Sequence, residues 1–313
     1  MTENIKYCGR LSQIGIYFNK FLRMFVYQSD WKVLPMSAAI VALVTLVVGT
    51  NMFVTQEGTT FGTFALTCVC IWNGVFNSIQ VVCRERDIVK REHRAGMHIS
   101  SYILAHMLYQ LLLCILQAGI TVLICWIVGI QFPAAGVITP LGIIDFGITI
   151  LLITYASDMI GLMISCIVRT TTTAMTVMPF LLIFQLIFSG GFFELGSADF
   201  VKVATISHWG MDSLCTVAHF NELPMVTIWN MLVGFKDEIM IGGVKPLKDL
   251  LIYMEKTEHR DLFLHWTAER SANPAYDAVA SNVWLCWGVL LLMIVLFAVV
   301  AVIALKLVDR DKR

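Results

Sequence analysis

The residues best suited to chemistry in this sequence form one charged stretch, Cys83 to Tyr102, CRERDIVKREHRAGMHISSY. Between Arg84 and Arg94 it carries five Lys or Arg and three Asp or Glu, and the segments on either side are apolar. Side chains of mixed sign cannot enter lipid and suit a complementary protein surface. The stretch therefore fits either a docking surface or a solvated loop, and its residue types alone leave both open.

No motif of enzymatic chemistry accompanies this stretch. The sequence has no phosphate-binding loop, no dinucleotide fingerprint, no HExxH and no Cys/His cluster with metal spacing. His98, His106 and His208 are isolated, and a structural histidine with satisfied ring nitrogens is favoured over a ligand for each. We therefore expect no catalytic site, no metal and no cofactor bound by this chain itself.

The composition is that of a membrane protein. Of 313 residues 58% are hydrophobic and only 14% charged, whereas a soluble domain has about a quarter of its residues charged. A spanning helix needs about 20 apolar residues. Six runs of roughly that length predict six spans and an all-α polytopic fold: Val33 to Val54, Phe61 to Val82, Tyr102 to Ile130, Leu141 to Val168, Met175 to Phe193 and Val283 to Leu305.

The distribution of Lys and Arg predicts the orientation of these spans. The short connections Thr55 to Thr60 and Gln131 to Pro140 have neither residue, whereas the opposite connections and both termini are basic. The positive-inside rule then places both termini and the charged stretch in the cytoplasm of a cell-membrane protein. The predicted divisions are a cytoplasmic part (1–32), five spans (33–193), an external segment (194–282), and the last span with its tail (283–313).

The segment before the first span, Leu11 to Trp31, alternates between apolar and polar faces at helical spacing. Leu11, Ile14 and Phe18 share one face, and Lys20 and Arg23 lie on the other. This pattern is typical of an amphipathic helix in the membrane interface. Membrane anchoring alone and contact with a cytoplasmic partner are both compatible with it.

The external segment contains one cysteine, Cys215, so no disulfide can form within it. A bridge between two copies of the chain is one interpretation, and a small apolar residue near the membrane surface is the favoured one. Phe200, Ile206 and Trp209 lie next to polar residues, which predicts short helices between Ala198 and Ala218 that dip back toward the membrane.

Two acidic residues, Asp145 and Asp158, lie within the fourth predicted span. An acid at the centre of a spanning helix costs about 2.5 to 3.5 kcal/mol on insertion scales, so both should face protein or water. Asp145 is close enough to the span's end to reach the external interface. For Asp158 a structural partner such as Ser157, Ser165 or a polar group on another span is favoured over a role in proton or substrate transfer.

Several segments, taken in order, resemble a known family. The charged stretch has two glutamates seven apart, Glu85 and Glu92, followed by Gly96 and by Ser-Ser-Tyr. The further segments are TYASDMIGLMIS from Thr154, FQLIFSGGFFEL from Phe184, ISHWGMDSL from Ile206 and HFNEL from His219. Together they resemble the membrane domain of G-type ABC exporters, the white-pigment and multidrug half-transporter group, over nearly the whole chain.

The resemblance implies roles for particular residues. Residues 83–98 would form the coupling helix that docks on the ATPase, with Glu85, Arg91, Glu92, Arg94 and Gly96 as its matching positions. Spans two and five would line the substrate path and its external valve, although each residue there could equally be a helix-packing contact. The path residues are Trp72, Asn73, Asn77, Ile183 and Leu186, and the valve residues are Gly191 and Phe192.

The resemblance also implies partners. Family members usually carry their ATPase ahead of the interfacial helix, and only a short tail precedes Leu11 here. We therefore expect either a separate ATPase subunit, which binds ATP and Mg, or a chain split from a longer one that carries the ATPase. The other expected partners are a second permease subunit and surrounding lipid, with no nucleic acid. The expected function is ATP-driven export of an amphipathic, lipid-like or peptide substrate. An ATP-independent secondary transporter and a membrane receptor or scaffold are the alternatives.

Overall fold

The computed structural model describes residues 9–27, 30–190, 196–240, 245–257 and 259–308. Within these residues the chain is helical and contains no strand. A bundle of long helices forms the body of the molecule, and its core is one contiguous apolar cluster. A helical fold is what a lipid environment demands, because a helix satisfies its backbone hydrogen bonds within one segment.

Five helices, joined in two cases to a short neighbouring helix, are long and apolar enough to cross a membrane. Each corresponds to one of the six predicted spans. They are α2 (Val33–Val48), α3 (Gln56–Ser78), α6 (Ile99–Val128), α7 (Gly142–Ile167) and α13 (Ala280–Val308). A short 3-10 helix, η1 (Asp30–Lys32), leads into α2, and α4 (Val81–Arg84) continues α3.

The remaining predicted span, Met175 to Phe193, corresponds to the shorter helix α8 (Thr171–Ile187). The Thr170 side chain caps its N-terminus by accepting a hydrogen bond from the Thr173 amide at 3.2 Å. Its 17 residues extend over about 26 Å, close to the hydrocarbon thickness of about 30 Å. The structure thus gives five helices of full spanning length, and a sixth span remains a prediction.

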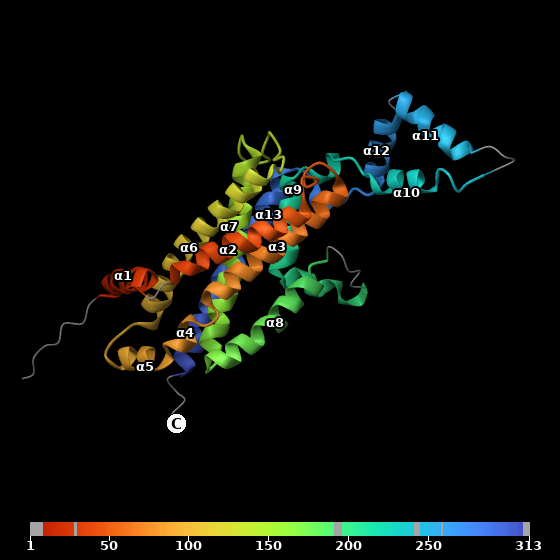
Figure 1. The fold of residues 1–313 in the computed structure, drawn as a ribbon. Coiled ribbons are helices and arrows are strands. Elements are labelled where there is room, and N and C mark those ends of the chain that lie inside the picture. Colours follow the sequence, from red (N-terminus) through yellow and green to blue (C-terminus); the bar gives the residue numbers. More distant parts are fainter. Residues whose placement is uncertain (1–8, 28–29, 191–195, 241–244, 258, 309–313) are drawn as a thin grey trace, which may run out of the picture.

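The long helices run alternately up and down (Figure 1). The α2–α3 and α6–α7 connections lie at one end of the bundle, near α9 (Ile206–Val217). The short helices α4 and α5 (Arg86–Arg94) lie at the other end, where α13 also terminates. The helix α1 (Arg10–Tyr27) packs beside α6 at that same end. This arrangement follows the alternation that the basic residues predicted.

The closest packing in the bundle joins α3 to α7, because glycines remove the side chains between them. A Cβ on Gly74 would lie 2.3 Å from the Thr154 carbonyl oxygen, and one on Gly161 would lie 2.5 Å from the Ser78 hydroxyl. The Ser78 hydroxyl donates a hydrogen bond of 2.6 Å to the main-chain carbonyl of Asp158. Small residues permit this backbone approach in a membrane, where dispersion contacts replace the hydrophobic driving force.

The segment 196–276 begins with two helices where short dipping helices were predicted. They are the 3-10 helix η2 (Gly196–Ala204) and α9, and α9 packs against α3, α7 and α13. Beyond the 3-10 helix η3 (Phe220–Glu222), three helices project from the bundle (Figure 1). They are α10 (Thr227–Phe235), α11 (Pro246–Lys256) and α12 (His259–Arg270), followed by the 3-10 helix η4 (Pro274–Tyr276).

Two contacts define how this segment joins the bundle. The Glu57 carboxylate accepts hydrogen bonds from the Val226 and Thr227 amides, the shortest at 2.6 Å, and so holds the N-terminus of α10. Cys215 is fully buried, 3.5 Å from the Thr63 hydroxyl. A disulfide from Cys215 to a second chain would require α9 to move out of the bundle. The burial of Cys215 therefore supports the favoured interpretation, a small apolar residue.

We predict that Gly74→Ala destabilises the bundle by about 1 to 3 kcal/mol, since the added methyl group meets backbone of α7 that cannot move aside. Thermal unfolding in detergent measures the effect. Gly119→Ala on α6 is the matched control, because no atom lies within 4 Å of its Cβ position. Equal melting temperatures for the two variants would show that the α3–α7 contact is not tight.

Candidate functional site

The charged stretch folds into α4 and α5 and a tight turn that leads to α6. Helix α1 supports this turn through one side chain, that of Gln13. Its Nε2 donates to the Gly96 carbonyl at 3.2 Å, and its Oε1 accepts from the His98 amide at 2.9 Å. Gly96 has φ +106°, a conformation that only glycine adopts without strain. The amphipathic helix thus contacts the charged stretch directly.

Two further residues of α1 contact the acidic side chains of the stretch. The Tyr17 hydroxyl donates to Glu92 Oε2 at 2.9 Å. Lys20 Nζ lies 3.6 Å from Glu92 Oε1 and 3.7 Å from Glu85 Oε2. Burial, together with the hydrogen bond to Glu92, raises the pKa of Tyr17, so its phenol remains a donor at neutral pH. These contacts hold α5 against α1.

A second set of contacts joins the stretch to the end of α7. The Ser165 hydroxyl accepts hydrogen bonds from the Val82 and Cys83 amides at 3.0 and 3.1 Å. The Arg86 guanidinium donates to the Val168 carbonyl. Because α1 holds one side of the stretch and α7 the other, α4 and α5 are fixed relative to the spans.

The outer face of α5 carries side chains at helical spacing that have no role in these contacts. Asp87, Ile88, Arg91 and Arg94 are exposed, and Ile88 is 43% exposed. Apart from the Arg91 Nε, which lies 3.4 Å from the Asp87 carbonyl, none of them makes a hydrogen bond within the described part of the chain. This face, here called the α5 outer face, combines two cations, one anion and one apolar side chain.

The five predicted coupling residues therefore divide into two groups. Arg91 and Arg94 lie on the α5 outer face. Glu85 is buried and Glu92 is half-buried, and both face α1. Gly96 forms the turn that Gln13 contacts. The structure thus gives Glu85, Glu92 and Gly96 contacts within the chain, and leaves the two arginines free to meet a partner.

Three of the five predicted path residues line one apolar cavity of about 440 Å³ between α3 and α8. Trp72 contributes from α3, and Ile183 and Leu186 from α8. The remaining wall is formed by apolar side chains of both helices and by Gln185. In Figure 1, α8 lies apart from the other long helices along much of its length. Apolar walls with few polar groups suit a hydrocarbon ligand.

The two predicted asparagines lie elsewhere. Asn73 is buried on the face of α3 toward α2 and borders a small gap there with Asn77. Asn77 exchanges two hydrogen bonds with Gln117 of α6, at 2.8 and 3.1 Å. For Asn77 the structure thus supports the packing interpretation, because its amide is already paired within the bundle.

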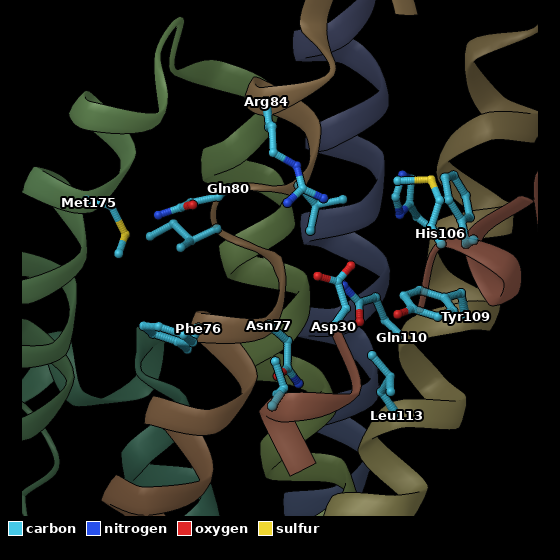
Figure 2. A pocket seen from close by; sticks show the side chains of 15 residues that line it. Asp30, Phe76, Asn77, Gln80, Arg84, His106, Tyr109, Gln110, Leu113 and Met175 are labelled. Atoms are coloured by element: carbon cyan, nitrogen blue, oxygen red, sulfur yellow. The ribbon is translucent and has the colours of Figure 1, made fainter. Parts of the chain in front are cut away.

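Sequence reasoning did not find a second cavity, of about 160 Å³, between α1, η1, α3, α4 and α6 (Figure 2). Its wall includes Asp30 of η1 and Arg84 of α4, and the charged ends of both side chains point toward the middle of the cavity. Neither side chain makes an ion pair or hydrogen bond within the described residues. From α6 it receives His106, Tyr109 and Gln110.

His106 and Gln110 are almost completely buried, and neither side chain has a hydrogen-bond partner among the described residues. Phe21 of α1 stacks on the His106 ring with 3.8 Å between the ring centroids. The expectation of satisfied ring nitrogens was therefore wrong for His106. A signal was present in the sequence, since His106, Gln110, Gln117 and Thr121 recur on one helical face of an apolar run.

The two intramembrane acids differ in their surroundings. Asp145 lies in the first turn of α7, where its carboxylate accepts hydrogen bonds from the Ile138 and Thr139 amides at 2.9 and 3.1 Å. It is fully buried and shapes the α6–α7 connection, so its carboxylate faces protein. The Asp158 carboxylate makes no hydrogen bond to Ser157, Ser165 or any other described residue, and the polar group that Asp158 meets on another span, the Ser78 hydroxyl, donates to its main-chain carbonyl. The Ser157 and Ser165 hydroxyls are engaged with backbone groups.

The predicted valve residues, Gly191 and Phe192, lie outside the residues that the structure describes. The preceding end of α8 is tied to the start of α9. The Ser207 hydroxyl donates to the Gln185 carbonyl, and the Thr205 hydroxyl lies 3.2 Å from the Phe188 carbonyl. The C-terminal end of α8 is therefore held against the N-terminus of α9.

Comparison with protein families gives one match. Residues 14–213 match the family model described as ABC-2 type transporter. The match extends from α1 through α9 and so covers more than half of the chain. No curated protein matches the chain.

We predict that Tyr17→Phe weakens the contact between α1 and α5. Losing a hydrogen bond to a charged group costs about 1.5 kcal/mol or somewhat less at this half-buried position. Hydrogen–deuterium exchange should rise in α1 and α5 and remain unchanged in α7. Tyr27→Phe is the control, because Tyr27 is 84% exposed on the same helix. Unchanged exchange in both variants would mean that the Tyr17–Glu92 bond does not hold the helices together.

Proposed function

Since the chain belongs to the ABC-2 type transporter family, we propose that it is the permease subunit of an ATP-driven exporter. It would carry an amphipathic, lipid-like substrate outward across the cell membrane, powered by a separate ATPase subunit. That subunit would bind ATP and Mg, while this multi-pass membrane chain supplies the path. In this proposal the α5 end of the bundle is cytoplasmic, as the distribution of basic residues predicts.

The observation that carries the proposal is the α5 outer face together with its fixed position. A face that transmits force from an ATPase must be polar enough to lie outside lipid and rigid relative to the spans. The α5 outer face is exposed and charged, and α1 and α7 hold its helix from two sides. A merely solvated loop would need neither set of contacts.

The polarity of α5 also favours a protein partner over a lipid surface. Arg91 and Arg94 could attract anionic lipid, but the exposed Asp87 and half-exposed Ile88 lie one or two turns before them on the same helix. A face that combines both signs of charge with an apolar side chain is typical of a protein interface. Docking here would couple ATPase movement to α3 through α4, which directly continues that helix.

A second permease subunit would complete the substrate path. Helix α8 forms one wall of the apolar cavity, and its outward side chains are exposed, with Phe180 70% and Ile183 54% exposed. Such side chains meet lipid or another apolar surface in a membrane. A copy of α8 from a second subunit would close the cavity on its open side, which supports a dimer of permease subunits.

We predict that Arg91→Glu and Arg94→Glu reduce co-purification with the ATPase and abolish substrate-stimulated ATP hydrolysis, while thermal unfolding of the membrane subunit stays unchanged. A desolvated charge pair at an interface is worth about 2 to 5 kcal/mol, and an exposed pair about 0 to 1. Docking should therefore weaken by well over about tenfold. Lys256→Glu, exposed on α11 at the opposite end, is the matched control.

Glu92 is unsuitable for this test, because its substitution also breaks the contacts with Tyr17 and Lys20. Two results would contradict the proposal. If both arginine variants behaved like Lys256→Glu, the α5 outer face would not be the docking site. If transport in vesicles followed a substrate gradient without ATP, the chain would be a secondary transporter.

A further inference from the structure

We infer that the polar cavity of Figure 2 binds the zwitterionic head group of one amphiphile, whose hydrocarbon chain lies in the adjoining apolar cavity. This inference rests on the proposed function, since it names the chemical class of the substrate and the site of its head. The head carries one cationic amine and one anionic phosphate.

The two cavities share walls. Phe76 of α3 and Met175 of α8 line both of them, so the polar space and the apolar one adjoin across these two side chains. The polar cavity measures about 160 Å³ and the apolar one about 440 Å³. One ligand that occupies both must have a small polar end and a larger apolar end, which is the shape of a lipid.

The charges in the polar cavity define the head group. Asp30 and Arg84 are of opposite sign, and neither is paired with a described residue, although each points inward. An anionic head would leave Asp30 facing a like charge, and an uncharged head would leave both charges unpaired. A zwitterion satisfies both, with phosphate on Arg84 and amine on Asp30.

Unpartnered polar groups deep in the wall indicate that something fills the space. The two ring nitrogens of His106 and both amide atoms of Gln110 lack partners among the described residues, and both residues are at most 1% exposed. Buried polar groups without hydrogen bonds are costly, and a polar ligand or its water would supply them. The Tyr109 hydroxyl lies beside them in the same wall.

The depth of the cavity also fits a lipid head. Asp30 lies in the short helix that joins α1 to α2, and Arg84 ends the helix that continues α3. Both positions are at the end of the apolar spans, where the hydrocarbon region meets water. A lipid could therefore enter with its head at its normal depth and its chain still within the hydrocarbon region.

The test uses the full membrane subunit purified without the ATPase. Native mass spectrometry compares retention of phosphatidylethanolamine (zwitterionic), phosphatidylglycerol (anionic) and a monoglycosyl diacylglycerol (uncharged). The wild type should retain phosphatidylethanolamine about tenfold more strongly than the other two, as expected for two charged hydrogen bonds. Water-soluble phosphoethanolamine should not compete, since it lacks the chain for the apolar cavity.

The two charge variants should have different effects. Asp30→Asn leaves Arg84 alone and should shift preference to phosphatidylglycerol, whereas Arg84→Gln should weaken retention of both phospholipids about tenfold. Ile183→Trp, which fills the apolar cavity from an exposed position, should weaken all three lipids. Lys32→Gln is the matched control, exposed beside Asp30 in the same short helix and not part of the wall.

Each other outcome overturns the inference. Equal retention of the three lipids by wild type and variants means that no head-group site exists, and preference for the glycolipid means a site for hydroxyl groups. Competition by phosphoethanolamine alone means that the apolar cavity takes no part. Because no ATPase is present, failure here leaves the docking proposal intact. Selective lipid retention without ATP-dependent transport would instead contradict the proposed function alone.

Discussion

The close contact of α3 with α7 is the constraint on which the rest of the molecule depends. With only hydrogen at Gly74 and Gly161, the two backbones meet, and α9 packs against both helices. This fixes α3, and α3 adjoins each of the candidate sites. Its C-terminal end continues into α4 and α5, and its outer faces line both cavities. A shift of α3 would therefore move the α5 outer face and both cavity walls together.

Helix α5 shows how one short helix can be both anchored and available. The acidic side chains on its inner side contact Tyr17 and Lys20 of α1. The side chains that anchor it to α1 are therefore negatively charged, whereas the arginines on its outer face are positively charged. It is connected to the end of α7 by the Arg86 guanidinium, and through the preceding helix α4 by two amides that donate to the Ser165 hydroxyl, so this connection does not use the charges of the outer face. The amphipathic helix α1 is thereby more than a membrane anchor, since it supports the turn that precedes α6.

Polar groups within the bundle serve two different purposes. The Asn77 and Gln117 side chains bond to each other and join α3 to α6, and the Asp145 carboxylate binds amides of the preceding connection. These polar groups have partners, and they make the bundle rigid. His106 and Gln110 break this rule on the same face of α6, as does Asp158 on α7. Satisfied networks specify a structure, whereas unsatisfied groups in a cavity wall, such as those of His106 and Gln110, mark a place where a ligand could complete them.

The sequence by itself determined the helical class, the positions of five full-length spans and the charged segment between two of them, because apolar length and charge density are local properties of the chain. It also placed Trp72, Ile183 and Leu186, which meet in one cavity. Only the tertiary structure decided that Glu92 faces α1 while Arg91 faces outward, since that depends on where a helix 75 residues away lies. The same holds for Asp30, Arg84 and His106, which share a cavity although they come from three separate segments. Their proximity is set by helix packing, and packing between distant segments leaves no local pattern in the sequence.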